Sequence, residues 1–191
     1  MSLHRSIQQI ADTIVGFHAR PVGDGPYQLY QYLPDQEYRV RRDLMDLKVW
    51  LGAKDISCVA ISLADMLWRT IDESGRLAAI ISAEKDGAAL EEVLGSINSI
   101  LKRPPVLAKR IEDDVAALEG TRAAIFLYRA GALYPVIRTS GLLDELLGRV
   151  RLPVTLLYPG RLHGGFGLSF MDIAPAHYGY RATIIPRGDD E

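Results

Sequence analysis

Apolar residues along this chain form two kinds of pattern, short continuous runs and longer stretches with helical spacing. Runs of about four to eight residues that are apolar on both faces are typical of strands in a parallel sheet covered on both sides. Such runs predict strands at residues 56–63, 123–128 and 154–158. The stretch at 27–33 has high strand propensity and an aromatic face at Tyr30 and Tyr32, and residues 181–186 are expected to form the last strand. Apolar residues three or four positions apart predict amphipathic helices at residues 3–18, 35–51, 64–74, 76–86, 88–102 and 106–118.

Residues 123–160 form the most informative unit of this pattern. An apolar run, AAIFLY, is followed by a short amphipathic helix and a second apolar run, VTLLY, which we expect to stop at Pro159 and Gly160. Two such strands joined by a helix are expected to lie side by side and parallel. Their carboxyl ends then share one edge of the sheet, where α/β proteins usually carry their sites.

The pattern as a whole predicts an α/β fold. We expect a mostly parallel central sheet of about four or five strands with helices on both faces, a Rossmann-like arrangement of three layers. A length of 191 residues suits a single domain over residues 1–191. The helices at 76–118, interrupted by Pro104 and Pro105, are either a helical insertion or a cover over one face. The polar end from Arg187 to Glu191 is expected to fray.

Composition narrows the class of protein without naming a function. The chain is 48% hydrophobic and 24% charged, as in ordinary globular domains, and its net charge of −2 gives no general attraction to nucleic acid or anionic lipid. No apolar stretch approaches the roughly 20 residues that span a bilayer. The single cysteine, Cys58, excludes a disulfide framework and favours a reducing compartment. We therefore expect a cytoplasmic protein.

Known catalytic and cofactor motifs are missing from the sequence. No strand is followed by a P-loop or a Rossmann glycine fingerprint, and the cluster from Gly164 to Gly167 is read as a turn. The histidines lack metal-ligand spacing, although His163, Asp172 and His177 could converge in a folded loop. Cys58 lies within a strand, where a buried and unreactive thiol is the default. We therefore expect no catalytic residue, no metal and no cofactor.

One polar position stands out at the expected strand-end edge. Arg138 precedes the helix of the 123–160 unit, which Thr139 or Ser140 can cap. A helix N-terminus beside an arginine favours an anion, either a phosphate or the carboxylate of a partner. The alternative is that Arg138 pairs with a carboxylate of this chain, such as Asp144.

Aromatic and basic side chains supply two further candidates. Tyr128, Tyr134 and Tyr158 lie at or near the same strand ends, either as buried residues with satisfied hydroxyls or as an exposed protein-contact surface. The basic group Arg39, Arg41 and Arg42 is read as a solvated helix face, with duplex DNA binding as the alternative.

Several segments in one order resemble a known family. They are YLPDQEYRVRRDL, SCVAISLADMLWRTIDESG, FLYRAGALYPVIRTSGLLDEL and PVTLLYPG with a glycine-rich stretch after it. This series looks like the BrxB family of bacterial BREX (bacteriophage exclusion) defence systems. The resemblance covers residues 27–186 and is strongest between Gly131 and Gly160.

The resemblance implies a non-enzymatic accessory or adaptor subunit whose partner is the alkaline-phosphatase-like protein of the same system. No catalytic residues are established for the family, so none can be carried over. We expect partner binding through Tyr134, Arg138, Tyr158 and His163, because aromatic and arginine side chains concentrate binding energy at interfaces. A nucleotide-binding or nucleotide-processing module that uses the same strand ends remains as the alternative function, and the sequence leaves a homodimer open.

Overall fold

A computed structural model describes residues 3–101 and 106–188, and its centre is a parallel sheet. Five strands run in the order β2-β3-β4-β1-β6, and every neighbouring pair is parallel. A further strand, β5, pairs antiparallel with the end of β4. The strands are β1 (Tyr27–Tyr32), β2 (Ser57–Ser62), β3 (Ala123–Tyr128), β4 (Val154–His163), β5 (Gly167–Phe170) and β6 (Thr183–Pro186). The predicted parallel neighbours β3 and β4 are confirmed.

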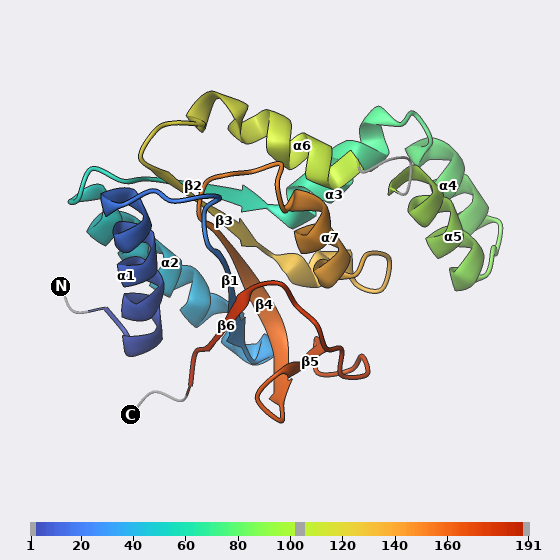
Figure 1. The fold of residues 1–191 in the computed structure, drawn as a ribbon. Helices are drawn as coiled ribbons and strands as arrows, with labels where there is room; N and C mark the ends of the chain where they lie inside the picture. Colours follow the sequence, from blue (N-terminus) through green and yellow to red (C-terminus); the bar gives the residue numbers. More distant parts are fainter. Residues whose placement is uncertain (1–2, 102–105, 189–191) are drawn as a thin grey trace.

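Helices cover both faces of this sheet (Figure 1). On one face lie α1 (Arg5–Ala19) and α2 (Glu37–Gly52), where Tyr30, Phe126 and Leu157 meet their apolar sides. On the other face lie α3 (Leu63–Glu73), α6 (Val106–Val115) and α7 (Thr139–Leu146). Neighbouring residues of one strand enter different cores, as Leu29 and Tyr30 do, because side chains alternate across a sheet. The predicted three-layer α/β fold is confirmed.

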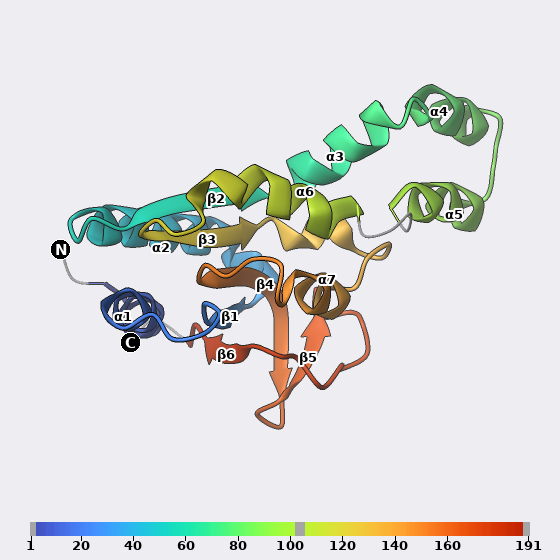
Figure 2. The same ribbon diagram turned by 45° about the horizontal axis from the view of Figure 1, so that its top comes forward.

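The helical block after β2 divides between two places. Helix α6 lies over the sheet, whereas α4 (Leu77–Lys85) and α5 (Leu90–Leu101) pack against each other beyond the end of the sheet, next to α3 (Figure 2). The block at residues 76–118 is therefore divided between one helix over the sheet and two beside α3. The predicted break at Pro104 and Pro105 lies outside the described residues. Three short 3₁₀ segments complete the chain, at Pro34–Gln36, Ala116–Leu118 and Ala130–Leu133.

The expected stop of β4 at Pro159 and Gly160 is wrong, because this strand continues to His163 and turns into β5. Pro159 is still in register with Tyr32 of β1, but the N–H of Val154 donates toward β1, so the backbone of Pro159, five residues later, faces the other side. On that side the pairing of β4 with β3 has already ended at Leu156, so no ladder bond needs the missing N–H of Pro159. Gly160 allows the two backbones of the hairpin to approach closely. A Cβ at this position would stand 2.2 Å from the carbonyl oxygen of Ser169.

The expectation of fraying is wrong for Arg187. This residue is buried, and its backbone N–H donates to the carbonyl of Gln31 at 2.8 Å, which extends the pairing of β6 with β1. Its guanidinium Nε lies 2.9 Å from Oδ2 of Asp43 on α2. Residues 189–191 lie outside the described part of the chain.

Candidate functional site

A hollow of about 340 Å³ lies between the N-terminal end of α7, strand β5 and the segment at 174–180. Its walls are mostly apolar and aromatic, with a few polar groups near the mouth. The lining residues are Tyr134, Pro135, Ile137, Arg138, Thr139, Ser140, Tyr158, Leu168, Phe170, Ala174, Pro175, Ala176, His177 and Tyr180. Three of the four predicted contact residues, Tyr134, Arg138 and Tyr158, are therefore brought together.

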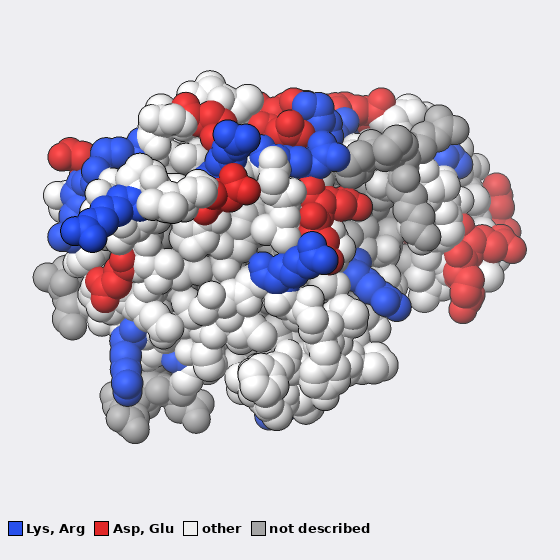
Figure 3. All heavy atoms as spheres, viewed as in Figure 1, with Lys and Arg blue, Asp and Glu red and all other residues white. Residues whose placement is uncertain are grey.

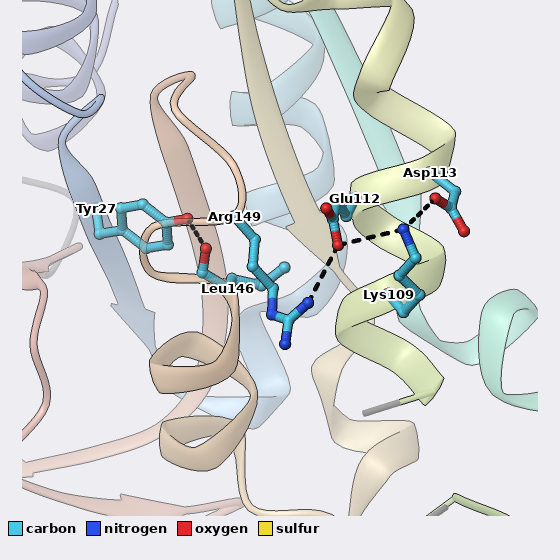
Figure 4. Close-up of polar contacts among 6 residues, drawn as sticks. All are labelled: Tyr27, Lys109, Glu112, Asp113, Leu146 and Arg149. Carbon is cyan, nitrogen blue, oxygen red and sulfur yellow. Dashed lines mark hydrogen bonds and ion pairs between the residues drawn. The ribbon is translucent and has the colours of Figure 1, made fainter. Parts of the chain in front are cut away.

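Helix α7 is fixed at its C-terminal end, which holds its N-terminal end against the hollow. The hydroxyl of Tyr27 on β1 donates to the carbonyls of Leu146 at 2.8 Å and Val150 at 3.0 Å. Arg149 reaches Glu112 of α6 at 3.3 Å (Figure 4). Two elements of the core thus anchor a helix of only about two turns.

The start of α7 differs from the sequence prediction. Arg138 is the residue that precedes the helix, and no side chain caps the first turn. Thr139 and Ser140 are instead buried against the hollow. The predicted side-chain cap is therefore wrong.

Tyr158 forms the floor of the hollow and takes the buried alternative considered for the tyrosines. Its ring packs edge-on against Phe170, with centroids 5.2 Å apart, and its hydroxyl accepts a hydrogen bond from Tyr180 at 3.2 Å. Burial, followed by this hydrogen bond, raises the pKa of Tyr158 well above its usual range. Tyr158 is therefore a neutral, positioning part of the hollow, whereas Tyr134 is 40% exposed at its mouth.

The charge at the mouth comes from Arg138. This side chain is exposed, and none of residues 3–101 and 106–188 forms an ion pair with it. Asp144, its proposed partner within the chain, instead lies 3.8 Å from Arg181. An uncompensated guanidinium beside an aromatic hollow suits a ligand that combines a carboxylate or another anion with an apolar group.

His163 does not join the hollow. It is exposed at the far end of β4, next to the turn at Gly164 and Gly165, where the extended strand carries it away from Tyr158. The predicted turn at the glycine cluster is confirmed.

An uncharged surface surrounds the hollow, and sequence reasoning missed it. Residues 162–180 contain a single charged residue of the Asp, Glu, Lys and Arg types, Asp172. Yet Phe166, Ile173 and Tyr178 in this segment are 75%, 69% and 61% exposed. Figure 3 shows this face as a continuous area without charged side chains, over β5 and the segment that follows it. The small number of charged residues in this exposed segment is the sequence feature from which the surface could have been found. We call the hollow together with Ile173 and Tyr178 the docking face.

The described residues offer little chemistry besides binding at this face. Among them, no group of three His, Cys, Asp or Glu side chains could hold a metal ion. Asp172 is held by Arg161 through two contacts of 2.9 Å, which lower the pKa of its carboxyl, and the ring of His177 packs against Tyr180 instead. Burial raises the pKa of the Cys58 thiol to about 11, so this group is a poor nucleophile.

The strand-end edge also lacks an open phosphate cradle in the described part of the chain. Ser62 already accepts a hydrogen bond from the N–H of Asp65 in the first turn of α3, at 3.2 Å. Asp65 adds a negative charge there and pairs with Arg129 at 2.9 Å. The glycines at 164–165 lie in the hairpin and do not line the hollow at Arg138.

No helix in the described residues has the length and apolar character needed to cross a membrane.

Comparison with known proteins gives one result that bears on identity. No curated protein matches the chain. A family model described as BREX protein BrxB matches residues 59–185, about two-thirds of the chain, from β2 to β6. The chain therefore belongs to the BrxB family and is a component of a BREX phage-defence system.

Proposed function

We propose that this protein is a non-enzymatic adaptor subunit that binds another BREX component through the docking face. The observation that carries the proposal is the exposed arginine without an ion-pair partner among the described residues, at the mouth of an aromatic hollow. Depletion of charge with enrichment of aromatic residues and arginine is the composition of protein interface cores. Tyr134 and Arg138 are the residues expected to carry most of the binding energy.

The partner we propose is the alkaline-phosphatase-like protein of the same system. The family resemblance of the sequence supports this choice, and the hollow supports a partner segment of defined chemistry. Such a segment places a carboxylate on Arg138 and an apolar side chain against Tyr134 and Phe170, whose rings lie 6.1 Å apart. The two contacts together favour a short acidic and apolar stretch of the partner.

Co-purification of the two proteins from a complete defence operon tests the proposal. Arg138→Glu and Tyr134→Ala are each expected to weaken capture by tenfold or more, the effect of losing about 1.4 kcal/mol at an interface hot spot. Matched controls are Arg5→Glu on α1 and Tyr38→Ala on α2, whose side chains are exposed on the other face of the sheet. Capture that is the same for all four variants would reject the docking face.

A second candidate, a nucleotide-binding module, is favoured by Arg138 beside the N-terminal end of α7. Calorimetry with ATP, GTP and cyclic dinucleotides distinguishes it from the adaptor. Heat of binding that Arg138→Glu abolishes would favour the nucleotide. No heat and no thermal shift at millimolar ligand would eliminate it.

A further inference from the structure

Among the described residues, no strand pairs with the outer side of β2. It is the last strand in the order β2-β3-β4-β1-β6, and Ser57 and Ala60 are exposed. The N–H of Ser57 donates to the carbonyl of Arg122 at 2.8 Å, toward β3. Successive residues of a strand direct their backbone groups to opposite sides, so those of Cys58 and Ala60 point away from the sheet.

This edge lacks the usual protection against pairing. Its sequence, SCVAIS, contains no charged residue, no proline and no glycine. Natural sheet edges are commonly blocked by such residues, by a short strand or by a covering element. The opposite edge shows these devices, because β6 has four residues, ends in Pro186 and contacts α1. This difference in protection between the two edges indicates that the outer side of β2 can pair with a further strand.

The surroundings of the open edge are basic on the side of α2. Lys48 lies near Cys58, where its charge opposes the rise in the thiol pKa that burial causes. Arg41 precedes Lys48 by seven residues, two helical turns, and so lies on the same side of α2. At the start of β2, Arg122 donates to the backbone carbonyls of Lys54 and Asp55.

Acidic groups balance this charge only in part. Asp55 lies at the start of the strand. At the far end, Asp65 and Asp114 are already paired with Arg129 and Arg69, at 2.9 and 3.1 Å. Glu37 lies one turn before Arg41 on the same side of α2, and its carboxylate accepts a hydrogen bond from the Tyr32 hydroxyl. An added strand would therefore meet a net positive charge from Lys48 and Arg41 along α2, which favours acidic side chains on the α2-facing side of that strand.

We propose that β2 is a strand-addition site for an extended segment of another protein, in which acidic residues alternate with apolar ones. The added strand pairs through main-chain hydrogen bonds to Cys58 and Ala60. Lys48 and Arg41 attract its acidic side chains and so favour an acidic segment over a basic one. A second copy of this chain is the poorer fit. Antiparallel pairing of β2 with itself about a two-fold axis would place the α2 helices, and hence both copies of Lys48, on the same side. The site is separate from the docking face and does not depend on the proposed adaptor role.

NMR titration of the ¹⁵N-labelled full chain tests this site, because it detects millimolar binding residue by residue. The probes are two short synthetic peptides, one alternating valine with glutamate and one alternating valine with lysine. The glutamate peptide is expected to shift the amide signals of Cys58 and Ala60, and the lysine peptide is not. Lys48→Glu is expected to weaken binding of the glutamate peptide several-fold, whereas Lys85→Glu on α4 leaves it unchanged.

Two variants at one position complete the test. Ala60→Pro removes an outward N–H and leaves the bonds to β3 in place, so it should fold and lose the response. Ala60→Glu, which places a negative charge on the edge, should lose it as well. The proposal is overturned if the glutamate peptide leaves Cys58 and Ala60 unshifted at millimolar concentration, or if both variants respond like the parent. Sedimentation that shows a dimer dissolved by Ala60→Pro would assign the edge to a second copy and also overturn it.

Discussion

Asp43 on α2 is the position where a small change should cost the most stability. Its Oδ2 lies 2.9 Å from Nε of Arg187 and accepts a hydrogen bond from the hydroxyl of Tyr30 at 3.0 Å. The side chains of Asp43 and Arg187 are 14% and 4% exposed. The carbonyl of Arg187 also accepts from the Ser6 hydroxyl on α1, at 2.8 Å. One carboxylate therefore joins α2, strand β1 and the chain after β6, which α1 also contacts.

Asp43→Ala would remove the carboxylate that contacts the buried Nε of Arg187. Removing one partner of a buried ion pair costs about 3–5 kcal/mol, because a desolvated charge loses a favourable interaction. Total stabilities of domains are only about 5–15 kcal/mol, so the variant should lose a large share of its free energy of unfolding. The Tyr30 hydroxyl would also lose its acceptor on Asp43, which lowers the free energy of unfolding further.

Urea unfolding followed by the fluorescence of Trp50 and Trp68 measures this loss by linear extrapolation. Asp43→Ala combined with Arg187→Met should be more stable than Asp43→Ala alone, since both charges are then gone. Asp172→Ala, which breaks the exposed pair with Arg161, serves as the control and should have a far smaller effect. A loss below about 1 kcal/mol for Asp43→Ala, or a double variant that is less stable than the single one, would refute the reasoning.

Two further predictions concern the hairpin and alkaline pH. Gly160→Ala should lower the melting temperature and the free energy of unfolding, the latter by about 1–3 kcal/mol or more, because the new Cβ would collide with the carbonyl oxygen of Ser169. The control is Gly16→Ala in α1, where no atom lies within 4 Å of the new Cβ, so that this variant should be neutral or slightly stabilising. Equal melting temperatures for the two variants would contradict the prediction. Burial raises the pKa of Tyr27, Tyr30, Tyr32 and Tyr158. Their contribution to stability is therefore complete below the unfolded pKa of about 10 and is lost as the pH rises above it. The urea midpoint should be lower at about pH 11 than at about pH 9, and an equal midpoint at the two pH values would count against this reasoning.

The parallel sheet was predictable because its strands are apolar on both faces. Ile125 and Phe126 of β3 enter different cores, and a strand of this kind leaves an uninterrupted apolar run, AAIFLY, in the sequence. The extension of β4 was not predictable from local residue types. Proline and glycine usually end a strand, and only the approach of Ser169 explains why Gly160 continues one.

The candidate site was predictable in part for a related reason. Tyr134, Arg138 and Tyr158 follow or end adjacent parallel strands, so the topology alone brings them together. Phe170 and Tyr180 come from a segment without helical or strand periodicity, and their place depends on the hairpin that the sequence did not reveal. The same hairpin removes His163 from the group.

Because β4 is shared by the parallel sheet and by the hairpin with β5, the hairpin is continuous with the middle of the molecule and not with its rim. A pulling force applied at the turn between β4 and β5 would travel along the covalent backbone of β4. The hydrogen bonds of β4 to β1 and β3 would then bear that load in shear, many at once, instead of opening one by one. A partner attached at this hairpin would therefore be joined to the sheet by a stiff mechanical link.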